Sequence, residues 1–273
     1  MKSLRSLSAV AVATICLSST TDALIWTDGF EDGGTTDVGI ATAFPGIWTG
    51  TGTQPTLKNE TFSTRPAGMT STDRAAAGPT SGNFISTRSL LTDYTTGTVT
   101  VEGWLQSRSN APTNANYAAL GLSTVERSGQ GHSEIMLRYL WSTGEIEVLD
   151  SFGAVLTSGD AYGTDQPSPD YNNSDPDNYN QWQHVLLEVD LDKQKARAFL
   201  DGDQSTPGGP WVQLGQTVDT TAQSISSIGY ASLLTSRDGI VDDMVTDTTP
   251  IPEPATLSVL ALSGILCLLR RHR

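Results

Sequence analysis

The 273-residue chain has few cysteines and few histidines, and each scarcity excludes a class of site. The two cysteines, Cys16 and Cys267, lie near the two ends, so the long segment between them cannot form a disulfide. The three histidines, His132, His184 and His272, stand in unlike contexts too far apart to predict a zinc site. The segment between the ends is therefore stabilised by packing alone.

Positive charge is also scarce, with 16 Lys and Arg against 30 Asp and Glu. Residues 1–23 and 250–273 hold five of the basic residues but two of the acidic ones, Asp22 and Glu253. The segment between them keeps 11 basic and 28 acidic residues, a net charge of −17. Such a surface disfavours nucleic acid and anionic lipid. It is compatible with calcium or with a neutral polysaccharide.

The C-terminal end carries an apolar run, Ala255–Leu269, between two distinctive flanks. Its 15 residues are fewer than the ~20 that a stable membrane span usually needs. Two prolines before the run keep a helix from continuing backwards, and a basic cluster after it favours the cytoplasmic side of a membrane. These flanking residues are Pro252, Glu253 and Pro254, then Arg270, Arg271 and Arg273.

This arrangement closely resembles the PEP-CTERM sorting signal of exported bacterial proteins. In that family the membrane protease exosortase recognises the tail and removes or replaces it. The resemblance implies a linker over residues 247–254, and a hydrophobic helix with a basic tail over residues 255–273. It also implies an inner-membrane intermediate, then delivery to the cell surface, the outer membrane or the extracellular matrix.

The N-terminal end has the features of a secretory signal peptide. Lys2 and Arg5 form a basic start, and residues 7–17 are mostly apolar. Thr21-Asp22-Ala23 then offers a small residue at a cleavage point. We therefore expect a signal peptide over residues 1–23 and passage through the export machinery.

Residues 24–246 have the pattern of one all-β domain. Residues 98–105 and 184–191 alternate apolar and polar side chains, and a polar turn at 192–195 leads from the second of these into a partner strand at 196–200. Further strands are predicted at residues 117–124, 134–141, 145–149, 227–234 and 239–245. Together these segments predict an antiparallel β sandwich.

One hairpin carries a resemblance to a known superfamily. Trp182-Gln183-His184-Val185, followed by Phe199-Leu200-Asp201-Gly202, is similar to a hairpin of laminin-G-like and concanavalin A-like lectin domains. The opening Asp28-Gly29-Phe30-Glu31 and the closing Ile240-Val241-Asp242-Asp243 are similar to the first and last strands of that superfamily. The resemblance implies a jelly roll, which hosts lectins, glycosidases and adhesive modules alike.

A carboxylate-rich strand suggests one catalytic alternative. The segment 145–150 resembles the catalytic strand of a concanavalin A-like glycosidase family, with Glu145, Glu147 and Asp150 at the three carboxyl positions. A retaining glycosidase needs two carboxyls ~5 Å apart on one face. Alternation places Glu145 and Glu147 together, but Asp150 opposite unless a bulge rotates it. The competing interpretation is a solvated strand face.

The stretch 160–181 is rich in Asp, Asn, Pro and Tyr. Its oxygen ligands could hold calcium, although a calcium loop's glycine and closing glutamate are missing. Tyr162, Tyr171 and Tyr179 could instead stack on sugar rings. A solvated loop shaped by turns is the alternative.

A second calcium hypothesis concerns the seam between the first and last strands. Glu31 and Asp32 could meet Asp242 or Asp243 there, and clustered carboxylates repel one another unless a cation lies between them. A structural calcium is therefore a possible cofactor.

The sequence as a whole favours an exported, non-catalytic protein that binds carbohydrate or matrix. Trp48, Trp104, Trp141 and Trp211 are candidates for a glycan platform, although each also fits ordinary packing. The rivals are a glycoside hydrolase using Glu145 and Asp150, and a passive surface component without a ligand.

Overall fold

The computed structural model describes residues 24–28, 30, 38–50, 54–59, 74–78, 82–107, 116–140, 143–160, 182–202, 210–236 and 239–249. The predicted signal peptide, most of the predicted linker and the predicted C-terminal helix lie outside these residues. Within the described ranges, no helix is long and apolar enough to cross a membrane.

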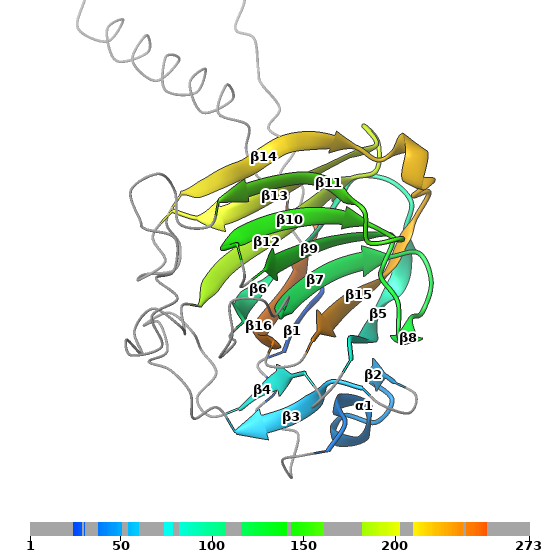
Figure 1. The fold of residues 1–273 in the computed structure, drawn as a ribbon. Helices are drawn as coiled ribbons and strands as arrows, with labels where there is room; N and C mark the ends of the chain where they lie inside the picture. Colours follow the sequence, from blue (N-terminus) through cyan, green and yellow to red (C-terminus); the bar gives the residue numbers. More distant parts are fainter. Residues whose placement is uncertain are drawn as a thin grey trace, which may run out of the picture.

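Two antiparallel sheets pack face to face and confirm the predicted sandwich (Figure 1). Sheet A has the order β14-β13-β12-β6-β16-β4-β3, with β1 also paired to β16. Its strands are β1 (Trp26–Asp28), β3 (Thr56–Asn59), β4 (Arg74–Ala77), β6 (Thr98–Ser107), β12 (Gln183–Asp190), β13 (Lys195–Asp201), β14 (Trp211–Asp219) and β16 (Gly239–Asp247).

Sheet B has the order β11-β10-β9-β7-β15-β5-β2, with β8 paired to β5. Its strands are β2 (Trp48–Thr49), β5 (Phe84–Tyr94), β7 (Tyr117–Ser123), β8 (Ser128–Gly129), β9 (Ile135–Leu140), β10 (Glu145–Asp150), β11 (Val155–Asp160) and β15 (Ile228–Thr235). A short helix α1 (Ile40–Ala43) and a 3₁₀ turn η2 (Thr221–Gln223) complete the described elements.

The core lies between the sheets and follows the predicted alternation. Val99, Val101 and Leu105 of β6 are fully buried in it, together with apolar side chains of β12 and of β7, β9 and β10 from the other sheet. Because strand side chains alternate, the intervening residues of β6 and β12 point to the outer face of sheet A. The hairpin from β12 to β13 pairs Val185 with Leu200, as the sequence predicts.

The first and last strands lie side by side, which was also predicted. β1 pairs antiparallel with β16, and Trp26 is opposite Thr246. The sequence did not predict strands β2, β3, β4, β5, β8, β11 and β14.

The two sheets approach each other closely at one edge, where β11 faces β14 (Figure 1). Gly215 has a φ of +61° and lies in a bulge of β14 opposite β13. A Cβ atom at this position would lie 2.5 Å from Oγ1 of Thr157 and 2.7 Å from the carbonyl oxygen of Ser158. The glycine therefore permits both the left-handed backbone and the close approach of the two sheets.

Candidate functional site

The predicted catalytic carboxylates lie on β10, and Glu147 is engaged in an ion pair. Its Oε2 accepts hydrogen bonds from Nε of Arg138, at 2.8 Å, and from Nη2 of the same side chain. The guanidinium of Arg138 lies 5.1 Å from the ring centre of Tyr117. Glu147 is buried and its carboxylate charge is matched by a fixed cation, an arrangement suited to a structural role.

Asp150 is separated from Glu145 and Glu147 by the alternation of β10. The pairing of β10 with β9 is regular through Asp150, opposite Ile135, whereas the bulge lies on the side of β11. The Asp150 carboxylate caps the following turn, because its Oδ1 accepts hydrogen bonds from the backbone N–H groups of Phe152 and Ala154, both at 2.9 Å. No bulge rotates Asp150 onto the face of Glu145.

Asp242 and Asp243 lie at a bulge of β16. Asp242 is fully buried, its Oδ1 accepts a hydrogen bond of 2.8 Å from the backbone N–H of Asp243, and Asp243 has a φ of +46°. Among the residues that the structure places, no group of three or more His, Cys, Asp or Glu side chains could hold a metal ion. Because Glu31 lies outside those residues, the calcium hypothesis stays a prediction, which melting curves with and without a chelator would test.

The remaining predicted site residues also lie outside the described ranges. They are Tyr162, Tyr171 and Tyr179 of the long loop, and the sorting residues Pro252, Glu253, Pro254, Arg270, Arg271 and Arg273.

A stack of three aromatic rings lies on the outer face of sheet A. His184 of β12 is opposite Trp104 of β6, with ring centres 4.6 Å apart and ring planes inclined by 13°. Trp211 of β14 packs against His184 at a tilt, with ring centres 5.0 Å apart and ring planes inclined by 47°. Trp104 is buried, whereas Trp211 is partly exposed. The stack thus presents one indole ring at the surface.

A buried carboxylate holds the imidazole in this stack. Nδ1 of His184 lies 3.0 Å from Oδ2 of Asp201, whose side chain is fully buried. Burial lowers the pKa of His184, and the hydrogen bond and charge of Asp201 oppose that shift in part. His184 is therefore neutral at physiological pH and acts as a flat, oriented ring.

Glu102 of β6 lies on the same outer face and has an unusual charge environment. Burial, together with the charges of Asp247 and Asp201, raises its pKa to about 7. Its protonation therefore changes in the physiological range.

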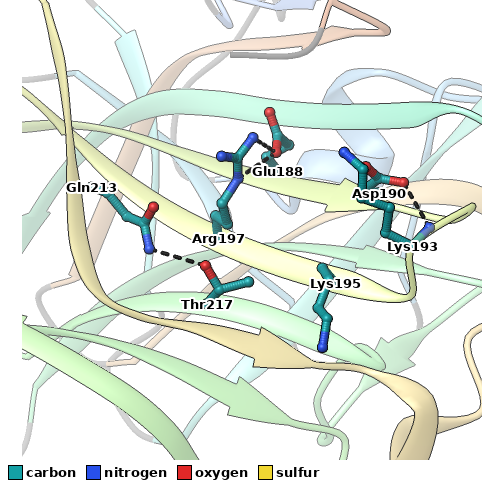
Figure 2. Close-up of a pocket in the computed structure, with 7 residues that line it drawn as sticks. All are labelled: Glu188, Asp190, Lys193, Lys195, Arg197, Gln213 and Thr217. Atoms are coloured by element: carbon teal, nitrogen blue, oxygen red, sulfur yellow. Dashed lines mark hydrogen bonds and ion pairs between the residues drawn. The ribbon is translucent and has the colours of Figure 1, made fainter. Parts of the chain in front are cut away.

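A polar pocket lies farther along this face, over β12, β13 and β14 (Figure 2). Its volume is about 160 Å³. The lining residues are all polar or charged: Glu188, Asp190, Lys193, Lys195, Arg197, Gln213 and Thr217. The hairpin register pairs Glu188 with Arg197 and Asp190 with Lys195, so these four side chains share the outer face with His184.

The ion pairs of the pocket differ in burial. Arg197 donates from both Nε (2.8 Å) and Nη2 (2.6 Å) to Oε1 of Glu188, and their side chains are 14% and 2% exposed. The Lys193 side chain is 67% exposed and pairs with Asp190, whereas Lys195 pairs with Asp219 at the rim. Nε2 of Gln213 donates to Oγ1 of Thr217 at 3.2 Å.

Sequence reasoning missed this pocket and anticipated part of the stack. Trp104 and Trp211 were candidates for a glycan platform, whereas Trp48 is buried in the core and Trp141 lies outside the described residues. At residues 192–195 the sequence predicts a turn but no binding site. One strand of the predicted hairpin has acidic residues at alternate positions, Glu188 and Asp190. The other has basic residues at alternate positions, Lys195 and Arg197. This charge pattern across the hairpin could have located the pocket.

No protein-family model and no curated protein sequence matches the chain. Solved lectin-like structures do match. The carbohydrate recognition domain of Emp47p has a TM-score of 0.45 and 7% identity, covering 85% of this chain and 100% of that domain. Basic winged bean lectin with Tn-antigen has a TM-score of 0.44 and 7% identity, covering 81% and 96%.

A third match is arcelin-5, a lectin-like defense protein from Phaseolus vulgaris, with a TM-score of 0.43 and 9% identity, covering 74% of this chain and 90% of that one. Structural similarity at this level does not indicate a function for this chain.

Proposed function

We propose that the protein binds carbohydrate, without catalysis, on the outer face of sheet A over β12, β13 and β14. The observation that carries this proposal is a partly exposed Trp211, packed against His184, on the same outer face as a pocket lined by polar side chains. An aromatic face can pack against the apolar face of a sugar ring. Neighbouring carboxylates, amides and cations can bind its hydroxyl groups.

The fixed positions of these side chains in the free protein support the same proposal. The Trp211 ring is packed against an imidazole that Asp201 orients, and the floor of the pocket is the buried pair of Arg197 and Glu188. Side chains already fixed in the free protein lose less conformational entropy when a ligand binds.

The experiment is a panel of oligosaccharides and polysaccharides, with binding to the full-length protein and release of reducing ends measured on the same samples. Binding without product release supports the proposal. Turnover that disappears in Glu145→Gln would instead establish the glycosidase alternative. The absence of binding to every member, with and without calcium, would favour a passive surface component.

We also propose that the protein is exported and sorted through its C-terminal end. The support is the sequence pattern at residues 1–23 and 252–273. Expression in a host with and without an exosortase, followed by mass spectrometry of the mature ends, tests the proposal. It predicts loss or replacement of the tail only when the protease is present. An intact tail in both hosts would contradict the proposal. The matched variant is Glu253→Ala, which changes one residue of the predicted sorting motif.

A further inference from the structure

Basic side chains are concentrated at the polar pocket. The whole chain has four lysines, Lys2, Lys58, Lys193 and Lys195, and two of them line this pocket beside Arg197. Three cations therefore face two carboxylates in the lining, within a chain whose net charge is −14. The lining thus carries more positive than negative charge, unlike the chain as a whole, and Asp219 at the rim balances the excess.

The two lysines are held by pairs that can exchange with a ligand. Lys195 and Asp219 are 41% and 63% exposed, whereas Lys193 is 67% exposed and its partner Asp190 is 16% exposed. Ion pairs with an exposed ammonium group contribute little to stability. The buried pair of Arg197 and Glu188 differs, because breaking it would leave a charge without its partner.

The carboxylates of Asp190 and Asp219 still accept other hydrogen bonds when the lysine ammonium groups move away from them. Oδ1 of Asp190 accepts a hydrogen bond from the backbone N–H of Lys193, whereas the ammonium of Lys193 binds Oδ2. Asp219 is arranged in the same way: its Oδ1 binds the N–H and the hydroxyl of Thr221, and its Oδ2 binds Lys195. Both ammonium groups can therefore turn towards a ligand while each carboxylate stays oriented.

The size of the pocket limits the ligand. Its volume of about 160 Å³ is below the ~300–1,000 Å³ of sites that enclose drug-sized molecules. One sugar unit fits this space, and Trp211 on the same face would contact a neighbouring unit.

We infer that the pocket selects an anionic sugar unit, carrying a carboxylate or a sulfate ester, whose charge Lys193 and Lys195 bind. The inference rests on the carbohydrate-binding function proposed above. Arg197 stays paired with Glu188. Gln213 and Thr217 provide hydrogen-bonding groups for the hydroxyls of the same unit.

The test is the affinity of the full-length protein for short oligosaccharides, measured by calorimetry. The probes are an oligogalacturonate, a sulfated dextran oligosaccharide and a neutral dextran oligosaccharide of equal length. Short probes are used because a long polyanion would also meet the acidic remainder of the surface. The double variant Lys193→Gln/Lys195→Gln is compared with Lys58→Gln, which removes one positive charge from β3.

The expected result is a preference for one or both anionic probes and a loss of about tenfold or more in the double variant, a change of roughly 1.4 kcal/mol. Lys58→Gln should bind like the unaltered protein. The affinity should also fall between 50 and 500 mM salt, because screening weakens exposed charges.

Equal affinity for the neutral and anionic probes, or an unaltered affinity in the double variant, would overturn the inference. If neutral probes bind and Trp211→Ala alone abolishes that binding, the proposed function survives and charge selection fails. If none of the three probes binds, the inference fails, and the wider panel described above decides whether the proposed function fails with it.

Discussion

The imidazole of His184 lies flat against the indole of Trp104, with ring centres 4.6 Å apart. Asp201 orients this imidazole from the next strand, and Trp211 packs against it at a tilt. Four strands of sheet A, β6, β12, β13 and β14, thus contribute side chains that meet at one histidine. The arrangement explains how a face outside the core can hold a fixed aromatic surface.

Replacing His184 by alanine should destabilise the protein. The change removes the ring that packs against two tryptophans and the hydrogen bond to a buried Asp201 carboxylate. We expect the free energy of unfolding to fall by about 2–4 kcal/mol. Urea denaturation measures this change, and His132→Ala, which removes a less buried histidine, serves as the control. Equal losses in the two variants would show that the stack contributes little.

The raised pKa of Glu102 makes stability depend on pH. Because its folded pKa of about 7 lies above the ordinary value of 4.5, the folded protein binds more protons between these values. The stabilising contribution is present below pH 4.5 and is lost as the pH rises through 7. His184 acts in the opposite sense, because its lowered pKa reduces stability as the pH falls below 6.5.

The variant Glu102→Gln isolates the first effect. It should match the unaltered protein near pH 4.5 and exceed its stability at pH 8 by on the order of 2–3 kcal/mol. Melting curves across this range give the difference, with Glu126→Gln at an exposed site as the reference. A constant difference at all pH values would contradict the assignment to Glu102.

The ion pair of Arg138 and Glu147 should behave as a structural pair. Arg138→Met leaves the mostly buried Glu147 without this partner, and we expect a loss of about 2–4 kcal/mol. The double variant Arg138→Met/Glu147→Leu should recover most of that loss. Additive losses would mean that the two side chains contribute independently.

Gly215 should tolerate no side chain. Alanine there meets both the unfavourable positive φ and contacts of 2.5 and 2.7 Å with β11, so we expect a loss of about 2–4 kcal/mol. Gly97→Ala is a matched control, because Gly97 has a φ of +77° but nothing within 4 Å of the added atom. Its expected loss is about 1 kcal/mol, from backbone strain alone. Equal losses would remove the close approach of the sheets as the cause.

The predicted strands were those with regular alternation of large apolar residues. β6, β12 and β13 could be located because valine and leucine recur at every second position over a hydrophobic core. β14 was missed because its bulge separates buried Leu214 from buried Val218 by four residues. β4 was missed because alanine, its main residue, is a weak strand former.

The candidate site was only partly predictable for a related reason. The rings of Trp104 and His184 meet across a pairing of β6 with β12 that local sequence does not specify. The pocket needs the hairpin register and also the position of β14, whose bulge places Thr217 near Gln213. The roles of Asp150 and Glu147 likewise depend on the turn after β10 and on a β9 arginine, both outside the carboxylate strand.

The most direct test of carbohydrate binding on sheet A compares two aromatic variants of the full-length protein against the tightest-binding saccharide of the panel. Trp211→Ala removes the partly exposed ring beside the polar pocket, and Phe152→Ala removes a ring that is 90% exposed at the β10–β11 turn of sheet B. We predict at least a roughly tenfold loss of affinity for Trp211→Ala, equivalent to about 1.4 kcal/mol, and no change for Phe152→Ala. An unaltered affinity in Trp211→Ala, or a loss confined to Phe152→Ala, would contradict the account.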